Sequence, residues 1–353
     1  MAAVKSVKGY AAHDSSGTLT PFNFSRRTTG TKDVVFKVKY CGICHSDLHQ
    51  IRNEWKGSVY PMVPGHEIVG VVTEVGSEVS KFNVGDHVGV GCMVMSCGAC
   101  SFCKKQNEQH CSSVIWTYNS IDLDGTCTYG GYSDLMVANE KFVVRIPENL
   151  PLEGAAPLLC AGITVYSPMS HFKMTEPGKH LGVVGLGGLG HMAVKFGKAF
   201  GLKVTVISTS PNKREEALKN LRADAFLISK DMDAIKGAAH SMDYIIDTVS
   251  APHDLDRLMT LLAPDGRLVL VGVPPEPFEI KPFSLIAGRR SVSGSNIGGI
   301  QETQEMLDFC GQKNITSTIE KISVDYLNIA MDRLSKADVK YRFVVDLETI
   351  ERA

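Results

Sequence analysis

Four cysteines gather in one short loop, within the segment SCGACSFCKKQNEQHC. Cys97, Cys100, Cys103 and Cys111 follow the spacing C-x2-C-x2-C-x7-C, in a chain of 353 residues that has ten cysteines. Thiolates this closely spaced can wrap one tetrahedral Zn²⁺, and four of them leave no open position for a substrate. The spacing therefore predicts a structural zinc lobe over about residues 92–115, against the alternative of four free or redox-active thiols.

A glycine turn further along the chain could bind a dinucleotide. Gly185, Gly187 and Gly190 form G-x-G-x-x-G between an apolar, strand-like segment and an amphipathic, helix-like one. In that context the glycines let the backbone approach a pyrophosphate, which sits at the helix N-terminus. The alternative is a plain glycine-rich turn. The expected contact residues are Gly185, Leu186, Gly187, Gly188, Leu189 and Gly190.

The segment after the next expected strand favours NADP(H) over NAD(H). An acidic residue about 20 residues beyond the turn would hold the ribose 2′-OH of NAD. Here the sequence reads VISTSPNKRE, in which Ser208, Thr209 and Ser210 offer hydroxyl groups and Lys213 and Arg214 offer positive charge. The alternative for the two cations is a solvated helix start, although cations are disfavoured at that end of a helix.

Two kinds of sequence pattern indicate the elements that must position these groups. From about residue 34 to residue 151, short alternating segments broken by Gly and Pro predict a β-rich region. From about residue 180 to residue 290, strand and helix patterns alternate, which predicts βαβ units with a parallel sheet. The tail holds a helix-like IQETQEMLDFCG and a last strand, YRFVVDL. The expected fold class is α/β.

Composition restricts the classes of function. The chain is 44% hydrophobic and 21% charged, with a net charge of −1 and no basic stripe, which argues against nucleic acid as a partner. It contains no apolar run long enough to predict a membrane span, and its first residues lack the apolar region of a secretory signal. We therefore expect a cytoplasmic protein, in which clustered cysteines bind metal more often than they form disulfides.

A second group of possible metal ligands can be recognised only through a resemblance to a known family. Its members lie too far apart in the chain for spacing to connect them, and a single Cys is more often a small buried hydrophobe. The ordered segments GICHSDLH, PGHEIVGVV, the four-cysteine loop, PLLCAGITVYSP and GLGGLGHMAVKF resemble the zinc-dependent medium-chain dehydrogenases. They are most similar to the plant cinnamyl alcohol dehydrogenase branch, which also holds sinapyl, mannitol and monoterpenol dehydrogenase-like enzymes. The resemblance covers nearly the whole chain.

The resemblance implies a fold and an assembly. A GroES-like catalytic β domain would comprise residues 1–156 and 295–353, and a Rossmann NADP-binding domain, residues 157–294, would be inserted into it. Such proteins are typically homodimers. The structural zinc would lie in the four-cysteine loop of the GroES-like domain.

The resemblance also implies a catalytic zinc. Cys44, His66 and Cys160 match its ligands, and Glu67 matches a residue that can approach or bind the metal. The zinc polarises an aldehyde carbonyl while NADPH supplies the hydride. Ser46 and His49 match a relay that carries the proton through the ribose to solvent, although His49 could also be an ordinary surface histidine. His45 is not expected to ligate the metal.

Further cofactor contacts follow from the same matching, and the substrate is the weakest part of the interpretation. The matched cofactor positions are Ser46, Thr164, Thr248, Gly272, Ser295, Asn296 and Ile297. Trp55 and Trp116 could stack on a flat aromatic aldehyde, or could instead pack in the core. Val273 and Ile286 would keep an apolar lining. Asn296 stands where lignin-type members carry a large aromatic residue, which leaves a strict phenylpropanoid preference open.

The resulting hypothesis is a zinc-dependent, NADPH-linked alcohol dehydrogenase acting on coniferaldehyde, sinapaldehyde or cinnamaldehyde. The alternatives are relatives that reduce terpenoid aldehydes, interconvert polyols and ketoses, or reduce monoterpene indole alkaloid iminium ions. A more distant alternative is a non-catalytic NADPH-binding zinc protein. The other cysteines have no expected role beyond packing; they are Cys41, Cys92, Cys127 and Cys310.

Overall fold

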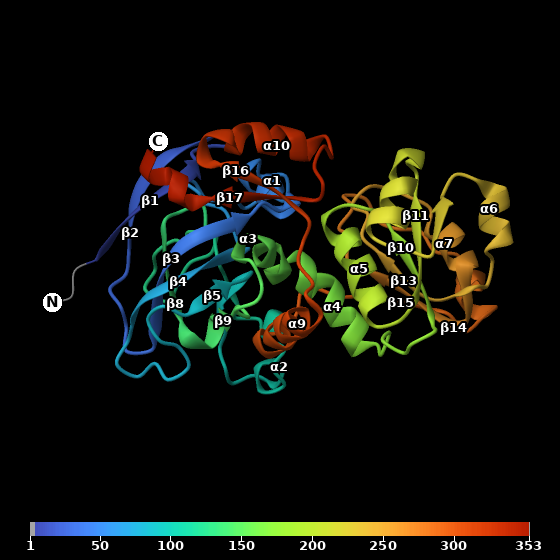
Figure 1. The fold of residues 1–353 in the computed structure, drawn as a ribbon, viewed down its shortest axis with the longest axis horizontal. Coiled ribbons are helices and arrows are strands. Elements are labelled where there is room, and N and C mark those ends of the chain that lie inside the picture. The colour runs from blue at the N-terminus through green and yellow to red at the C-terminus, as the bar shows by residue number, and fades with distance from the viewer. Residues whose placement is uncertain (1–3, 353) are drawn as a thin grey trace. The chain divides into compact units, whose positions relative to one another are not determined.

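The computed structural model describes residues 4–352, which form two compact units (Figure 1). Unit 1 is made of Met1–Ile163 and Gly298–Ala353, and unit 2 is Thr164–Ile297. These limits fall a few residues beyond the boundaries at 156 and 294 expected from the sequence. Each unit has its own sheet and its own buried apolar core.

Unit 1 is built on a seven-stranded sheet to which both parts of its chain contribute. The strand order is β16-β17-β3-β4-β5-β9, and β8 also pairs with β3. In Figure 1 the late strand β17 lies beside the early strand β3, and β16 pairs with the other edge of β17. The strands are β3 (Asp33–Gly42), β4 (Ile68–Val75), β5 (His87–Val90), β8 (Leu135–Asn139), β9 (Val144–Arg145), β16 (Ile319–Ser323) and β17 (Arg342–Asp346).

The remaining elements of unit 1 surround this sheet. Two antiparallel pairs are β1 (Lys5–Ala12) with β2 (Leu19–Arg26), and β6 (Met93–Met95) with β7 (Ile115–Trp116). The helices are α1 (His45–Ile51), α2 (Ser101–Lys104), α3 (Leu152–Ala155), α9 (Ile300–Lys313) and α10 (Leu327–Ser335). The core brings apolar side chains of both chain parts together, for example Phe36, Ile68 and Phe343. Removal of this apolar surface from water is the main term that stabilises the unit.

Unit 2 has a six-stranded sheet in which every neighbouring pair is parallel. The order is β12-β11-β10-β13-β14-β15. The strands are β10 (His180–Val184), β11 (Lys203–Ser208), β12 (Ala225–Ile228), β13 (Met242–Asp247), β14 (Leu262–Leu270) and β15 (Ser291–Gly294). The helices are α5 (Gly188–Ala199), α6 (Met232–Gly237), α7 (Leu255–Leu261) and α8 (Pro282–Ile286), and α4 (Ala161–His171) leads into the unit. The strand order reverses between β10 and β13, the point where doubly wound sheets bind ligands.

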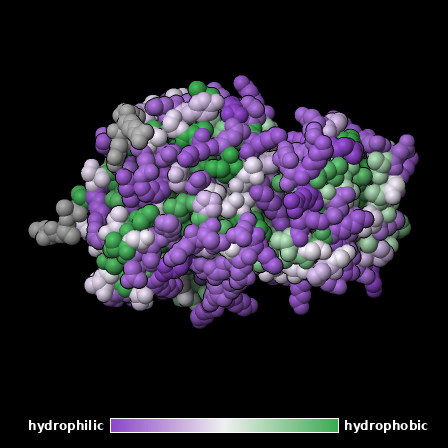
Figure 2. Space-filling model, viewed as in Figure 1, coloured by the Kyte–Doolittle hydropathy of each residue, from purple (hydrophilic) through white to green (hydrophobic). Residues whose placement is uncertain are grey.

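The predicted fold class is confirmed: a β-rich GroES-like unit and a doubly wound, Rossmann-type unit. The helix expected from NKREEALKNL is less regular than predicted, because a 3₁₀ turn at Pro211–Lys213 is followed by a π turn at Glu216–Asn220. Hydrophilic residues cover most of the face shown in Figure 2. Among the described residues, no helix is both long enough and apolar enough to cross a membrane.

Candidate functional site

Cys44, His66, Glu67 and Cys160 converge in unit 1 from three separate stretches of the chain. One donor atom from each lies within 4.8 Å of the others. Cys44 follows β3 and caps α1, His66 and Glu67 immediately precede β4, and Cys160 immediately precedes α4. Because β3 and β4 pair antiparallel, the end of one strand lies beside the start of the other.

The chemistry of this donor set fits a divalent zinc-type metal. The contact with Cys160 lowers the pKa of the Cys44 thiol well below its ordinary value, and the same contact raises the pKa of Cys160. Two thiols that share a proton in this way present a thiolate, which is the form that binds metal. Glu67 is fully buried, and neither of its carboxylate oxygens accepts a hydrogen bond. A buried carboxyl group whose oxygens accept no hydrogen bond offers free lone pairs to a metal.

Asp47 orients His66, and the sequence analysis did not identify it. Nδ1 of His66 donates to Oδ1 of Asp47 over 3.1 Å, which leaves Nε2 as the metal-facing nitrogen. Asp47 is itself fully buried and also accepts from the backbone N–H of Cys44 (2.9 Å) and from the hydroxyl of Tyr132 (3.3 Å). Burial would lower the pKa of His66, but Asp47, Cys92 and Cys44 together outweigh it and the pKa is raised well above its ordinary value.

Arg342 is a second buried charge beside the set that sequence reasoning missed. It is 3% exposed, its Nη2 lies 3.2 Å from Oε1 of Glu67, and its Nη1 donates to the carbonyl of Ile43 over 3.1 Å. Burial raises the pKa of Glu67 to about 8, although Arg342 opposes this rise. A signal was present in the sequence, because an arginine that opens the apolar strand RFVVD needs a buried partner.

The four-cysteine loop brings its sulfur atoms together at a second position in unit 1, separate from the donor set of Cys44 and His66. Neighbouring sulfurs are 3.5 Å apart for Cys100–Cys103 and for Cys97–Cys111, and 3.9 Å apart for Cys97–Cys103. Ligands at about 2.3 Å from a tetrahedral zinc would be roughly 3.8 Å apart, whereas a disulfide needs about 2.05 Å. Backbone N–H groups of Ala99 and Cys100 lower the pKa of Cys97 to about 6. The loop geometry therefore suits one zinc bound by four thiolates.

The glycine turn of unit 2 links β10 to α5. Gly185 has φ of +86°, which favours glycine, and a Cβ on Gly190 would lie 2.2 Å from the carbonyl oxygen of Gly185. Gly187 caps α5 and has open space around it. The turn thus leaves the N-terminus of α5 accessible to a phosphate, as the motif predicts.

The other expected cofactor positions follow the carboxyl ends of the parallel strands of unit 2. Thr248 follows β13, Gly272 lies just beyond β14, and Ser295–Ile297 follow β15. Ile297 has φ of 39°, an unusual conformation for a β-branched residue and one that often marks a functional segment. Thr164 is nearly buried at the start of the unit. Thr248, Gly272 and Ser295–Ile297 therefore share the carboxyl-end edge of the sheet, where dinucleotides bind in such folds.

Lys213 and Arg214 differ in where their charges lie. Nζ of Lys213 donates to the carbonyl of Leu186 over 2.9 Å, which places the ammonium beside the glycine turn, and burial lowers its pKa. The guanidinium of Arg214 instead lies 5.1 Å from the ring centre of Phe226. Ser208 ends β11, and its hydroxyl accepts from the N–H of Ser210. Of the two cations, Lys213 is therefore the one held against the glycine turn.

Comparison with known proteins identifies the family. The alcohol dehydrogenase GroES-like domain matches residues 30–148, and the zinc-binding dehydrogenase domain matches residues 188–312. The chain belongs to the zinc-dependent alcohol dehydrogenases. The predicted resemblance is confirmed.

Relatives of this dehydrogenase are named after several different substrates. It is 63% identical to a probable mannitol dehydrogenase of Fragaria ananassa (97% of this chain, 96% of the relative) and 62% identical to an 8-hydroxygeraniol dehydrogenase of Catharanthus roseus (96% and 94%). Its structure matches a cinnamyl alcohol dehydrogenase from Sorghum bicolor with a TM-score of 0.95 at 55% identity over 98% of both chains. A Helicobacter pylori cinnamyl alcohol dehydrogenase complexed with NADP(H) matches at 0.91 and 41% identity, over 98% and 99% of the chains.

The expected relay residues of the dehydrogenase lie on one helix. Ser46 and His49 are three residues apart on α1, so their side chains share a face. The Ser46 hydroxyl lies 3.4 Å from Nε2 of His66. His49 is partly exposed, its Nδ1 contacts the carboxylate of Glu54, and its ring centre is 5.0 Å from that of Trp55. Glu54, which limits how His49 can turn, was missed in the sequence.

The expected substrate residues are exposed to different degrees. Trp55 and Trp116 in unit 1 are 46% and 36% exposed, which rules out core packing as their role. Val273 and Ile286 in unit 2 are 63% and 70% exposed, and Asn296 is also exposed. Apolar side chains this open can take up a ligand or a protein partner.

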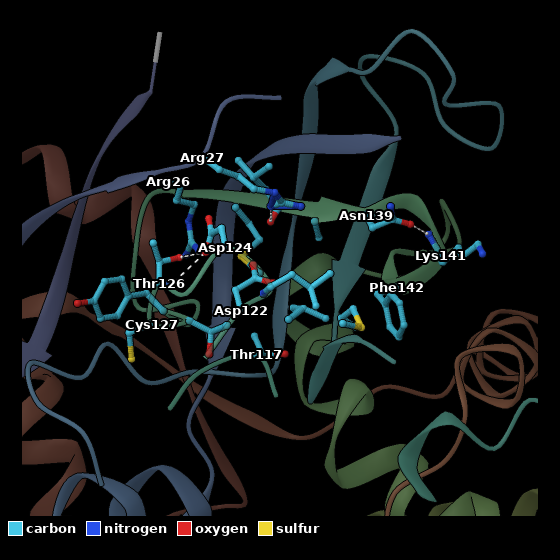
Figure 3. Close-up of a pocket in the computed structure, with 18 of the residues that line it drawn as sticks. Arg26, Arg27, Thr117, Asp122, Asp124, Thr126, Cys127, Asn139, Lys141 and Phe142 are labelled. Carbon is cyan, nitrogen blue, oxygen red and sulfur yellow. Dashed lines mark hydrogen bonds between the residues drawn. The ribbon is translucent and has the colours of Figure 1, made fainter. Parts of the chain in front are cut away.

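A separate pocket of about 610 Å³ lies in unit 1, between β2, β8 and the loop that follows β7 (Figure 3). Cys44, His66 and Cys160 do not line it. Arg26, at the end of β2, lines this pocket. Its guanidinium donates to the carbonyl of Leu135 (2.7 Å), where β8 begins, and to that of Gly130 (3.0 Å) in the loop, and so links β2 to both. We assign the pocket no part in the dehydrogenase chemistry.

The cysteines without an expected role separate into three kinds. Cys41 and Cys310 are fully buried, as packing residues are. Cys127 lines the pocket of Figure 3. Cys92 is different, because its thiol shares a hydrogen bond with the thiol of Cys160, which lowers the pKa of Cys92. Cys92 therefore borders the donor set of Cys44, His66, Glu67 and Cys160.

Replacement of Asp47 tests the orientation of His66. Asp47→Asn should reduce metal affinity and turnover together by about 10- to 100-fold, because His66 loses its anionic partner. Tyr132→Phe is the matched control, since it removes only one peripheral hydrogen bond to Asp47. Metal retention against a chelator and steady-state rates measure both effects. Equal losses in the two variants, or none in Asp47→Asn, would contradict this role.

Proposed function

We propose that this dehydrogenase is an NADPH-dependent zinc enzyme that reversibly reduces cinnamyl-type aldehydes to alcohols. The observation that carries the proposal is the convergence of Cys44, His66 and Cys160, with the Ser46 hydroxyl 3.4 Å from the metal-facing nitrogen of His66. Two thiolates and one imidazole leave a fourth position for a substrate oxygen. A non-catalytic NADPH-binding protein would have no need of this open set.

The bound metal and cofactor would supply one part of the proposed chemistry, and side chains of the protein would supply the other. When bound, zinc supplies Lewis acidity and NADPH supplies the hydride. Cys44, His66 and Cys160 would hold the metal, and Asp47 keeps His66 in the required tautomer. Ser46 would hold the proton next to the reacting oxygen. His49, partly exposed and one turn further along α1, would exchange that proton with solvent.

A second zinc and NADP(H) specificity belong to the same proposal. Cys97, Cys100, Cys103 and Cys111 would bind a structural zinc, which leaves no position for substrate. The preference for NADP(H) is supported by Lys213, which lies beside the glycine turn, and by the absence of Asp and Glu from Ser208 to Arg214. The relative from Helicobacter pylori that is complexed with NADP(H) gives further support.

The aromatic aldehyde preference is supported by two tryptophans that point away from the core. Trp55 and Trp116 offer flat apolar faces on unit 1. A second candidate, reduction or oxidation of terpenoid substrates, is favoured by the exposed polar Asn296 and by the relative named 8-hydroxygeraniol dehydrogenase. Another relative is named as a probable mannitol dehydrogenase, which makes polyols a further candidate class of substrate.

We also propose a cytosolic homodimer. β15 is the last strand of the sheet in unit 2 and has one free edge. Close to it in sequence, Phe283 and Ile286 on α8 are 73% and 70% exposed. An unpaired strand edge next to exposed apolar side chains supports association with a second copy. Reduced thiols, which the metal sets need, suit the cytosol.

An aldehyde panel tests the proposed activity. NADPH oxidation is followed with coniferaldehyde, sinapaldehyde, cinnamaldehyde, geranial and an alkaloid iminium ion, and mannitol is tested for oxidation with NADP⁺. We expect the highest kcat/KM with the phenylpropenals. Cys44→Ser should abolish turnover while NADPH binding persists, because the glycine turn lies in unit 2. Unchanged turnover in Cys44→Ser would refute the mechanism, and activity confined to geranial would favour the terpenoid candidate.

A charge change tests the cofactor preference. Lys213→Ala should raise the KM for NADPH by roughly 10- to 100-fold, which corresponds to one charge-assisted hydrogen bond, and should leave the KM for NADH nearly unchanged. Lys219→Ala is the matched control, because Lys219 is exposed and pairs with Glu215 on the same segment. If both cofactors weaken equally, Lys213 does not read the 2′-phosphate.

A further inference from the structure

The loop that joins β13 to α7 in unit 2 (Figure 1) contains a histidine paired with a buried aspartate. Asp247 ends β13 and is 1% exposed, and its Oδ2 accepts from Nε2 of His253 over 2.7 Å. Nδ1 of the same ring donates to the carbonyl of Ala251 over 2.8 Å. A carbonyl and a carboxylate both accept, so both ring nitrogens carry hydrogen and His253 is an imidazolium. The hydrogen bond with Asp247 accordingly raises the pKa of His253 above its ordinary value.

This pair restrains a loop that has no regular structure of its own. Residues 248–254 form neither helix nor strand, and Ser250 and Ala251 are exposed. The aspartate holds both ends of the loop, because its Oδ1 accepts from the N–H of Val249 over 3.0 Å while its Oδ2 binds His253. An exposed loop without regular structure has little local stability, so these two charged side chains set its shape.

The restrained loop in turn places the segment that follows β14. Val249 packs against Gly272, where a Cβ would lie 2.3 Å from the Val249 carbonyl oxygen. The Ser250 hydroxyl accepts from the N–H of Val273 over 3.2 Å. Further along the same segment, the ring of Phe278 meets the imidazole edge to face, with the ring centres 5.2 Å apart. The histidine thus lies at the junction of the two loops.

These two loops belong to one half of the doubly wound sheet. Such sheets consist of two mononucleotide-binding halves that meet where the strand order reverses, which here is between β10 and β13. The glycine turn after β10 and Lys213 after β11 lie in the half expected to bind the pyrophosphate and the adenosine 2′-phosphate. The loops after β13 and β14 lie in the other half, which is left for the nicotinamide.

We propose that His253 is a positioning residue for the nicotinamide half of the cofactor, because it holds the loop after β13 against the segment after β14. Its action is indirect, through Val249 and Gly272. Without the imidazolium, Asp247 is buried with no counter-charge and the loop is released, so cofactor binding must then order it and becomes weaker. The inference rests on the proposed NADP(H) function and extends it to a residue outside the expected contacts.

Calorimetric titration of the full chain with NADPH and with adenosine 2′,5′-bisphosphate tests this role. The second ligand carries the 2′-phosphate but has no nicotinamide. His253→Ala should raise the Kd for NADPH roughly tenfold, the effect of one hydrogen bond to a charged group, and should leave the Kd for the bisphosphate unchanged. His253→Gln, whose amide N–H can still donate to Asp247, should recover part of the affinity for NADPH.

A matched control and the two ligands separate this role from a general loss of stability. His240→Asn removes a histidine that contacts Arg290 at the opposite end of β13, and it should leave both Kd values unchanged. Equal weakening of both ligands in His253→Ala, or unchanged NADPH affinity, overturns the inference. A loss in His253→Gln as large as that in His253→Ala also overturns it.

Two further outcomes keep the test decisive. If His253→Ala does not fold, His253→Gln decides the question, because it should still weaken NADPH and not the bisphosphate; equal effects on the two ligands would overturn the inference. If the wild-type protein binds neither ligand, the proposed NADP(H) function itself is refuted, and this inference with it.

Discussion

The antiparallel register of β3 with its neighbours is the constraint on which the metal site depends. Cys41 pairs with Ile68 of β4, and Gly42 pairs with Val344 of β17. Beyond the ends of the strands, the same register places the residues that follow β3 beside two groups of residues. These are the residues that precede β4 and the residues that begin β17. A shift of one residue would turn every side chain of the shifted strand to the other face and would separate the donors. The apolar core across the sheet, which draws on both chain parts, fixes that register.

The site is also a balance of buried charges. With a divalent metal bound, two thiolates and an ionised Glu67 would carry three negative charges, and the metal with Arg342 would carry three positive ones. Asp47 adds another buried anion, which is offset by hydrogen bonds from a histidine, a tyrosine and backbone N–H groups. Burial of such groups is unfavourable unless each has its partner, so loss of one partner should affect the others.

The sequence predicted those features of the fold and the site that depend on short motifs. The thiol spacing of the Cys97 loop and the glycine turn at Gly185 each act within one stretch of chain, and the alternating patterns gave the fold class. The convergence of Cys44, His66 and Cys160 needed a family resemblance, because it depends on pairing between distant strands. Asp47 and Arg342 were missed for the same reason. Nothing local distinguishes a buried carboxylate in a helix, and an arginine that opens an apolar strand signals a buried charge without identifying its partner.

The number of zinc ions per chain tests the central claim most directly. Metal analysis of the purified protein should give about two zinc ions per chain, and Cys44→Ser should give about one while the four-cysteine lobe stays loaded. Cys103→Ser in a separate preparation should remove the other ion. One zinc in the wild-type protein, or two in Cys44→Ser, would contradict the existence of a catalytic metal held by Cys44, His66 and Cys160.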